Sequence, residues 1–334
     1  MKRLVILAPN WLGDAVMALP AIADIRRSAP AASITVAARP AVAPLFALVP
    51  EVDETLLLGQ DESDALARND FDTALLLPNS TRAALIARRA GIPARWGYRT
   101  AWRGPLLTRA IPPPRHVHQV EYYQRLVQAL GFPNGPSGPR VAVTAEAREA
   151  GRALLISNGW NEASPLLAVA PGAAYGGAKR WPPAYFAELV EGLAADGVQC
   201  VMIGAAADAE TVVEVLGPGP KRGTREGGSP LILNLVGRTD LTTLAGVLAS
   251  CRGIVTNDSG AMHLAAAIGI SVTAMFGPTN EQATSPRSLS GPRIDILTHP
   301  VWCRPCMLRE CPLDHQCMRG IEVSAVLEAA RTGL

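Results

Sequence analysis

Along most of the chain, short apolar runs alternate with stretches in which apolar residues recur at helical spacing. In the first part, the strand-like runs cover residues 4–8, 34–38, 54–58 and 73–77. A helix is expected to begin near Asp14, and an amphipathic helix is expected over 121–130. Apolar, β-branched strands with helices between them are typical of a parallel sheet covered by helices on both faces.

A Gly/Pro-rich interval at 131–139 interrupts this pattern, and after a helix at 145–158 a second α/β series begins. It contains expected strands at 166–170, 198–203, 231–236, 253–256 and 272–276, and expected helices at 183–195, 207–216, 241–249 and 261–268. Two such series predict an α/β protein of two Rossmann-like domains, with parallel sheets that face each other across a cleft. We place the domains at 1–155 and 156–320, and we expect 321–334 to form a helix that packs back towards the first domain.

Composition agrees with this division and excludes several classes of protein. The 334 residues suit two domains, and 49% hydrophobic against 18% charged residues excludes a disordered chain or a coiled coil. A formal net charge of +2 gives no reason to expect wholesale nucleic-acid binding. The first apolar run is too short for a signal peptide, and the uncharged stretch at 259–280 divides into a helix and a strand. We therefore expect a soluble, cytoplasmic protein.

The first expected strand leads into the loop Pro9-Asn10-Trp11-Leu12-Gly13-Asp14, and a helix is expected to open at Asp14. A carboxylate in this position is stabilised by the free amides and the positive end of the helix dipole. Asp14 is therefore either a helix N-cap or a general base that the loop directs into the cleft. The loop lacks a GxGxxG pattern, which argues against NAD binding by the first domain.

The second domain opens with a strand, a glycine-rich loop at 171–178, and Lys179 shortly before a helix. Backbone amides, the helix dipole and one lysine make such a loop suitable for holding an anion. Lysine is rare in this chain, because only Lys2, Lys179 and Lys221 occur among 31 basic residues. The loop has no Walker A ending, so a phosphate site of another kind and an ordinary surface loop both stay open.

The segment Thr256-Asn257-Asp258-Ser259-Gly260-Ala261-Met262-His263 joins a short strand to a helix. Gly260 lets a ligand approach the backbone, and the amides of Ser259–Ala261 are free at the helix start. His263 follows Ser259 by four residues and so lies on the same face, one turn deeper. Alone, the segment fits a ligand-binding helix start and a capped helix with a core histidine equally well. Together with the Lys179 loop, it predicts a diphosphate site.

Two short motifs near the expected strand at 73–77 are discounted. Asp70-Phe71-Asp72 matches the DxD motif of metal-dependent sugar transferases, but it precedes the strand and is expected to be a solvated turn. Asn79-Ser80-Thr81 matches a glycosylation sequon, but nothing indicates secretion. Because this second motif follows the carboxyl end of a strand, we expect it to line the cleft.

The region between Asp72 and Glu121 has no acidic residue, and Trp96, Tyr98 and Trp102 are interleaved with its arginines. The arginines are Arg82, Arg88, Arg89, Arg95, Arg99, Arg103, Arg109 and Arg115. Three interpretations stay open: a solvated basic face, a patch for an anionic glycan or membrane surface, and, third, a site for single-stranded nucleic acid.

Four of the six cysteines lie close together near the C-terminus, as Cys303, Cys306, Cys311 and Cys317. Such crowding suggests zinc, but the spacing C-x2-C-x4-C-x5-C fits no standard zinc finger. A structural zinc site is therefore not favoured, and a reducible disulfide clip or free thiols in a packed loop are the alternatives. We expect no catalytic role for these cysteines, and no cofactor is predicted.

Taken together, the motifs resemble those of the ADP-heptose:lipopolysaccharide heptosyltransferases, and most of all the branch that adds the second heptose of the inner core. The resemblance covers nearly the whole chain. It rests on the segments 9–14, 77–80, 171–173, 179–182, 257–263 and 276–279, and on the cysteine-rich tail 303–312. The Asp258-Ser259-Gly260 segment is shared across the wider family, whereas the loop 10–14 and the tail are more specific to this branch.

The resemblance implies a GT-B architecture, in which the C-terminal domain holds a nucleotide-sugar donor and the N-terminal domain holds the acceptor. It also implies an inverting, metal-independent transfer of L-glycero-D-manno-heptose from ADP-heptose to the first heptose of the lipopolysaccharide inner core. On this basis Asp14 is the catalytic base that deprotonates the acceptor hydroxyl. The implied donor-binding residues are Gly172, Ala173, Lys179, Asp258, Ser259, Gly260, Met262 and His263, and the implied acceptor-binding residues are Asn10, Trp11, Asn79, Ser80 and Arg99.

The implied partners are ADP-heptose and a lipid-anchored, anionic acceptor at the cytoplasmic face of the inner membrane, with no nucleic acid. We expect Arg88 to Arg115 to steer this acceptor and the membrane surface towards Asp14. Two alternatives remain: a transferase or epimerase for another sugar nucleotide on the same fold, and a nucleotide-sugar or glycan-binding module without turnover.

Overall fold

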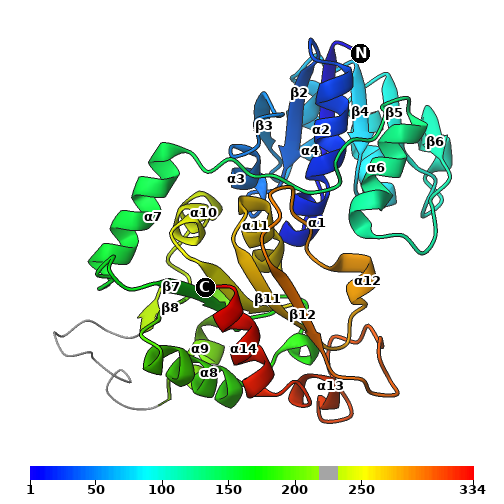
Figure 1. Ribbon diagram of the computed structural model, residues 1–334. Coiled ribbons are helices and arrows are strands. Elements are labelled where there is room, and N and C mark those ends of the chain that lie inside the picture. The colour runs from blue at the N-terminus through cyan, green and yellow to red at the C-terminus, as the bar shows by residue number, and fades with distance from the viewer. Residues whose placement is uncertain (218–231) are drawn as a thin grey trace. The chain divides into compact units, whose positions relative to one another are not determined.

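The structure is a computed structural model that describes residues 1–217 and 232–334 (Figure 1). The chain divides into two compact units, Met1–Ala142 and Val143–Leu334. In the described residues, each unit contains a six-stranded sheet in which the paired strands are parallel. The prediction of an α/β protein with two Rossmann-like units is confirmed.

In the first unit the strand order is β3-β2-β1-β4-β5-β6. The strands are β1 (Arg3–Leu7), β2 (Ser33–Ala38), β3 (Glu54–Leu57), β4 (Thr73–Leu76), β5 (Ala94–Tyr98) and β6 (Arg109–Ile111). The helices are α1 (Leu12–Met17), α2 (Leu19–Ser28), α3 (Ala43–Phe46), α4 (Glu62–Ala67), α5 (Thr81–Arg89) and α6 (Gln119–Ala129), with a 3₁₀ turn η1 at Gly104–Leu106. β1 lies between β2 and β4, where Leu4 is opposite Ile34 on one side and Thr73 on the other.

The central strands β1 and β4 are buried because their sequences are almost wholly apolar, and they pack against the apolar side of α5. The start of β1 is held by Asp72, whose Oδ2 accepts hydrogen bonds from the amides of Lys2 (2.6 Å) and Arg3 (2.9 Å). Asp70-Phe71-Asp72 is therefore a connecting loop at the amino end of β4, as expected, although Phe71 itself is buried.

The second unit repeats this topology with the strand order β12-β11-β10-β7-β8-β9. Its strands are β7 (Leu166–Ala170), β8 (Gln199–Met202), β9 (Ile232–Asn234), β10 (Gly253–Asn257), β11 (Ser271–Phe276) and β12 (Ile294–Thr298). Its helices are α7 (Ala145–Ser157), α8 (Pro183–Ala195), α9 (Ala209–Leu216), α10 (Leu241–Ala249), α11 (Gly260–Ile268), α12 (Glu281–Thr284), α13 (Gln316–Arg319) and α14 (Val323–Thr332), with 3₁₀ turns η2 at Gly177–Lys179 and η3 at Ala206–Asp208. Counted in chain order within each unit, both sheets follow the doubly wound order 3-2-1-4-5-6.

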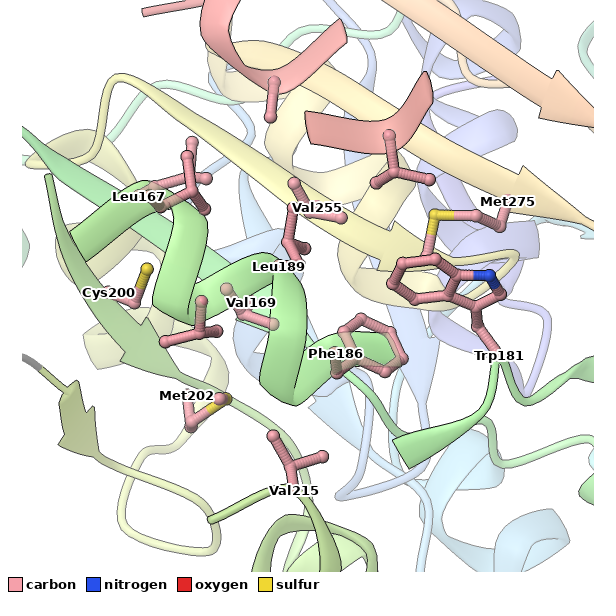
Figure 2. Packing of buried hydrophobic residues seen from close by; sticks show 14 of the residues in the cluster. Leu167, Val169, Trp181, Phe186, Leu189, Cys200, Met202, Val215, Val255 and Met275 are labelled. Carbon is pink, nitrogen blue, oxygen red and sulfur yellow. The ribbon is translucent and has the colours of Figure 1, made fainter. Parts of the chain in front are cut away.

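The core of the second unit is centred on the beginning of α8 (Figure 2). Trp181 and Phe186 pack there with Val169 and Met275 from the sheet. Trp181 is fully buried, and its indole N–H donates a 2.9 Å hydrogen bond to the carbonyl oxygen of Ile321. Because Ile321 lies two residues before the start of α14, this bond ties the end of the chain to the core.

The C-terminal helix α14 belongs to the second unit. Its buried residues Val326 and Ala330 are part of the core around α8, and the helix packs against α8, β10 and β11. The expectation that residues 321–334 pack back towards the first domain is therefore corrected, because the apolar stripe of the helix is used within the second unit.

The boundary between the units lies after Ala142, earlier than the predicted division at 155/156. The reason is that α7 packs on α10 of the second unit. At their crossing Gly151 lies against the backbone of Gly246, and a Cβ atom on Gly246 would overlap the carbonyl oxygen of Ala147. Two helices approach this closely only where side chains are absent, so the glycine pair fixes α7 to the second unit.

The sequence pattern missed the strands β5, β6 and β12, which lie at or next to sheet edges. They are short and half-exposed, so they lack the continuous apolar run of the central strands. The strand expected at 231–236 is observed as β9, while Leu231 and Lys221 lie outside the described residues. Within the described ranges, no helix has the length and apolar character needed to span a bilayer.

Candidate active site

The strand order places two pairs of loops where ligands bind in this topology. The winding of the sheet reverses between β1 and β4 in the first unit, and between β7 and β10 in the second. At such a switch point, the loops after the two strands diverge and leave room for a ligand at their carboxyl ends. Asn10 and Asn79 follow β1 and β4, and Lys179 and Asp258 follow β7 and β10. These four predicted acceptor and donor residues therefore lie at the two switch points, whereas Arg99 follows β5.

Asp14 lies in the first turn of α1, two residues after the helix begins at Leu12. The N-cap is Trp11, whose side chain makes no capping hydrogen bond and is 52% exposed. The interpretation of Asp14 as the N-cap is therefore wrong, and so is the expected helix start at Asp14. The Asp14 charge acts on Tyr123 of α6: burial first, and then the negative charge of Asp14, raise the pKa of the Tyr123 phenol.

Two adjacent tyrosines of α6 join Asp14 to the loop after β4. The Tyr122 hydroxyl accepts a 2.9 Å hydrogen bond from Asn79 Nδ2, and the Tyr122 carbonyl accepts a 2.6 Å bond from the Tyr98 hydroxyl. The ring centroids of Tyr122 and Tyr123 are 5.9 Å apart, and Tyr123 is the neighbour of Asp14. The helix thus brings the predicted base and a predicted acceptor residue into one region of the first unit.

Arg103 follows β5 and supports the loop after β4 from within the protein. It is fully buried, its Nε donates a 2.9 Å hydrogen bond to the carbonyl of Tyr98, and its Nη1 donates to the carbonyls of Pro78 and Ser80. Burial lowers the pKa of Arg103 to about 10, so the guanidinium is still charged at neutral pH. Arg103 is therefore a buried structural residue, and the expectation that it belongs to a basic surface is wrong.

The predicted acceptor residues are on the surface of the first unit. Asn10, Trp11, Asn79, Ser80 and Arg99 are all exposed at the carboxyl edge of the sheet. Ser80 has a structural task as well, because its Oγ accepts a hydrogen bond from the amide of Ala83 and caps α5. Exposure and position leave these side chains available to a ligand.

The arginines between Asp72 and Glu121 are divided between opposite edges of the first sheet. Those at the end of α5 or the start of β5 and β6 lie at the amino edge, because α5 runs back against the strands; they are Arg88, Arg89, Arg95 and Arg109. Arg95 and Arg109 are used internally, since Arg95 donates to the Leu106 carbonyl and Arg109 stacks 5.3 Å from the Trp96 ring centroid. The expectation that Arg88 to Arg115 act as one surface near Asp14 is therefore corrected. The arginines that follow carboxyl ends of strands and stay exposed are Arg82, Arg99 and Arg115.

Lys179 and Asp258 meet at the switch point of the second unit. The Lys179 Nζ lies 2.6 Å from Asp258 Oδ2, and the side chains are only 12% and 7% exposed. The hydroxyl of Thr279, from the loop after β11, donates a 2.6 Å hydrogen bond to the same carboxylate oxygen. Thr279 belongs to the motif at 276–279, but the local sequence pattern does not reveal its contact with Asp258.

Asn257 joins the two donor-side loops. Its Nδ2 donates a 2.7 Å hydrogen bond to the carbonyl of Pro171, and its Oδ1 accepts a 3.0 Å bond from the amide of Trp181. Asn257 is fully buried, so these bonds are shielded from water. One side chain at the end of β10 therefore fixes both ends of the Lys179 loop.

The segment after Asn257 combines half-buried and fully buried positions. Ser259 is the N-cap of α11, and its hydroxyl lies 3.0 Å from that of Thr256. Met262 is fully buried and His263 is 4% exposed. Met262 is consequently a core side chain in this structure, whereas Ser259 and Gly260 are half-buried at the start of the helix.

The glycines of the Lys179 loop are required by other parts of the protein. A Cβ atom on Gly172 would overlap the carboxylate of Asp208, which follows β8. Gly176 has φ +155°, and a Cβ atom there would overlap the carbonyl of Arg309. Gly177 lies against the carboxylate of Glu310. The sequence pattern predicts either an anion-binding loop or an ordinary surface loop here, and neither interpretation anticipates the close approach of residues far away in the chain.

The four clustered cysteines are free thiols in the structure, like Cys200 and Cys251. Burial, followed by the neighbouring thiols of Cys311, Cys303 and Cys306, raises the pKa of Cys317. The Cys311 Sγ accepts hydrogen bonds from the amides of Leu313 (3.4 Å) and His315 (3.3 Å). Among the residues described, no three His, Cys, Asp or Glu side chains are arranged to hold a metal ion. The sequence does not favour zinc for this cluster, and a disulfide clip and free thiols in a packed loop stay the alternatives.

Comparison with known proteins decides the family. Residues 63–316 match the model of glycosyltransferase family 9 (heptosyltransferase). The chain belongs to glycosyltransferase family 9. Lipopolysaccharide heptosyltransferase 2 of Salmonella typhimurium is 31% identical over 313 residues, which cover 89% of this chain and 88% of the relative. The lipopolysaccharide heptosyltransferase 2 of Escherichia coli is also 31% identical, over 318 residues, with the same shares of the two chains covered.

Comparison with solved structures agrees with this family assignment. The solved structure of E. coli ADP-heptose lps heptosyltransferase II has a TM-score of 0.83 and 30% identity to this chain, and the match covers 100% of this chain and 98% of that one. The predicted GT-B architecture is thereby confirmed, and this heptosyltransferase is an enzyme of the glycosyltransferase class.

Proposed function

We propose that this enzyme transfers L-glycero-D-manno-heptose from ADP-heptose to the first heptose of the lipopolysaccharide inner core. The names of its relatives support lipopolysaccharide as the acceptor class, and the name of the structurally similar E. coli enzyme supports ADP-heptose as the donor. The observation that carries the proposal is the group of Lys179, Asp258 and Thr279 at the switch point of the second unit.

The donor-side residues suit a sugar whose leaving group is a diphosphate. When the bond to the sugar breaks, negative charge grows on the departing ADP, and fixed positive groups stabilise it. Lys179 supplies a cation, and the free amides at the start of α11 supply the positive end of a helix dipole. Asp258 is a hydrogen-bond acceptor for heptose hydroxyls in this proposal, and His263 helps to fix the donor.

On the acceptor side, Asp14 acts as the general base. The acceptor hydroxyl gives its proton to the Asp14 carboxylate while its oxygen forms a bond to the anomeric carbon of the heptose. The bond between that carbon and the phosphate oxygen breaks with its electron pair on ADP. A single displacement of this kind inverts the anomeric configuration. Asn79 and Tyr122, which are hydrogen-bonded beside this region, help to position the acceptor.

Metal-independent transfer is part of the same proposal. The DxD-like pair Asp70 and Asp72 lies before β4, at the edge of the sheet opposite the switch point. Asp72 is also occupied by the amides of Lys2 and Arg3. The Lys179 ammonium and the amides of α11 then provide the positive charge that a metal provides in DxD enzymes.

The test is incubation of the full-length protein with ADP-heptose and a mono-heptosylated inner-core acceptor, with and without chelator, followed by mass analysis. One added heptose, unaffected by chelator, is the expected result. Competition by UDP- or GDP-sugars that displaces ADP-heptose would favour a transferase or epimerase for another sugar nucleotide. Donor binding with no product in any combination would favour a binding module.

We also propose peripheral contact of the first unit with the membrane that carries the acceptor. Trp102 is 99% exposed and follows the exposed Arg99 by three residues, on a loop at the carboxyl edge of the sheet. An exposed tryptophan beside basic side chains suits the interface of an anionic bilayer. Co-sedimentation with anionic vesicles should fall for Trp102→Ala and for Arg99→Glu, and equal binding of both variants and the parent would contradict this contact.

A further inference from the structure

The positive charge of Lys179 is already compensated within the protein. Its ammonium lies 2.6 Å from the Asp258 carboxylate, and both side chains are largely buried. At short range, the pair as a whole therefore carries no net charge. The amides of α11 carry only partial positive charge. A donor diphosphate bound here therefore needs a further cation to balance its negative charge.

The tail of the chain places a second cation on the Tyr175 ring that Lys179 also contacts. The Lys179 Nζ lies 4.7 Å from the centroid of the Tyr175 ring, and the Arg309 Cζ lies 5.3 Å from the same centroid. Arg309 is exposed, and in the part of the chain that the structure describes it forms no salt bridge. Its guanidinium is thus available to a ligand that binds at the Lys179 loop.

Backbone contacts hold Arg309 in this position. The Arg309 carbonyl accepts a 2.9 Å hydrogen bond from the amide of Ala178, and the neighbouring Glu310 Oε1 accepts a 3.1 Å bond from the amide of Gly177. The Tyr175 hydroxyl donates a 2.7 Å hydrogen bond to the Met307 carbonyl. These bonds join the segment 307–310 to the Lys179 loop, so the position of Arg309 depends on the loop that carries Lys179.

We infer that Arg309 is a second diphosphate-binding cation of the donor site, and that the segment between Cys306 and Cys311 serves to present it. The inference rests on the proposed function, because it assumes that a nucleoside diphosphate binds at the Lys179 loop. It also explains why Gly176 and Gly177 have no side chains: the presenting segment lies directly against them. A guanidinium is well suited to this task because it binds phosphate oxygens in a bidentate manner.

The experiment is calorimetric titration of the full-length protein with ADP, AMP and adenosine, for the parent and for Arg309→Ala, Arg309→Lys and Arg319→Ala. Arg319 is a matched control because it is an exposed arginine of the same tail, paired with Asp314. Arg309→Ala should weaken ADP binding about 10- to 100-fold, as expected for loss of charge-assisted hydrogen bonds, and should leave adenosine binding unchanged. Arg309→Lys should restore part of the affinity, and Arg319→Ala should behave like the parent.

Two results would overturn the inference while leaving the proposed donor intact. One is parental ADP affinity in Arg309→Ala. The other is an equal loss for ADP and adenosine, which would mean that Arg309 only supports the loop. Failure of the parent to bind ADP would instead contradict the proposed donor, and the inference with it. Unchanged adenosine binding also shows that each variant is folded.

Discussion

Replacing Asn257 by alanine removes the side chain that joins the two loops at the switch point of the second unit. The buried amide of Trp181 and the carbonyl of Pro171 then lose their partner. Leaving a buried donor or acceptor unsatisfied costs about 1–3 kcal/mol each, so the expected loss of unfolding free energy is about 2–6 kcal/mol. For a unit of this size, that loss lowers the melting temperature by on the order of 10 °C.

Scanning calorimetry measures this change directly, and ADP titration in the same samples measures its effect on the donor loops. The matched control is Asn69→Ala, which removes a single side-chain hydrogen bond to the Ala65 carbonyl on a half-buried surface and should cost about 1 kcal/mol or less. Asn257→Ala should also weaken ADP binding, because the Lys179 loop is no longer fixed at both ends. Equal melting temperatures for the two variants would refute the assignment of Asn257 as the residue that joins these loops.

Three further predictions concern packing, pH and thiol reactivity. Gly246→Ala should destabilise the protein by about 3 kcal/mol, because the new Cβ atom meets the α7 backbone. In the control Gly192→Ala, the new Cβ atom meets only the flexible end of the Leu327 side chain, so the loss of stability should be clearly smaller. Equal melting temperatures for the two variants would contradict the crossing of α7 and α10. Burial raises the pKa of Asp72, but hydrogen bonds from Thr73, Arg3 and Lys2 outweigh this effect and hold the pKa below its ordinary value of 3.8. The Asp72 carboxylate therefore stabilises the folded protein above that pH, and this stabilisation is lost as pH falls through the lower folded-state pKa. Asp72→Asn should therefore reduce the acid dependence of the melting temperature, and an unchanged acid limb would show that the carboxylate makes no such contribution. Burial raises the pKa of Cys200 to about 12. Under native conditions, iodoacetamide should therefore label the partly exposed Cys303, Cys306 and Cys311 well before Cys200. Equal labelling rates in peptide mass analysis would contradict the burial of Cys200.

The location of the candidate site could be predicted because it depends on local pattern and on one topological rule. Each apolar run ends in a loop, and the carboxyl ends of parallel strands lie at one edge of the sheet. Given the strand order in each sheet, the loops after β1 and β4 are neighbours, and so are the loops after β7 and β10. The contact of Lys179 with Asp258 follows from this arrangement.

The features that escaped prediction are contacts between distant segments. An arginine after a strand resembles a surface residue, and the burial of Arg103 depends on the carbonyls of Pro78, Ser80 and Tyr98. The glycines at 176 and 177 resemble a ligand loop, yet they accommodate a tail segment more than 130 residues further along the chain. Neither periodicity nor composition carries information about such pairs.

The same limitation explains the errors in the domain boundary and in the C-terminal helix. Helix α7 was expected to end the first domain because it precedes the next strand, but the backbone contact between Gly151 and Gly246 places it in the second unit. The apolar stripe of α14 indicates that the helix packs on something, without indicating on what, and α8 is the partner.

The measurement that tests the central claim most directly is the rate of heptose transfer from ADP-heptose to a mono-heptosylated acceptor by Asp14→Asn, compared with the parent at equal ADP occupancy. If Asp14 is the general base, the variant should bind ADP like the parent and transfer about 10²- to 10⁴-fold more slowly. Transfer at the parental rate by a variant that lacks this carboxylate would contradict the account.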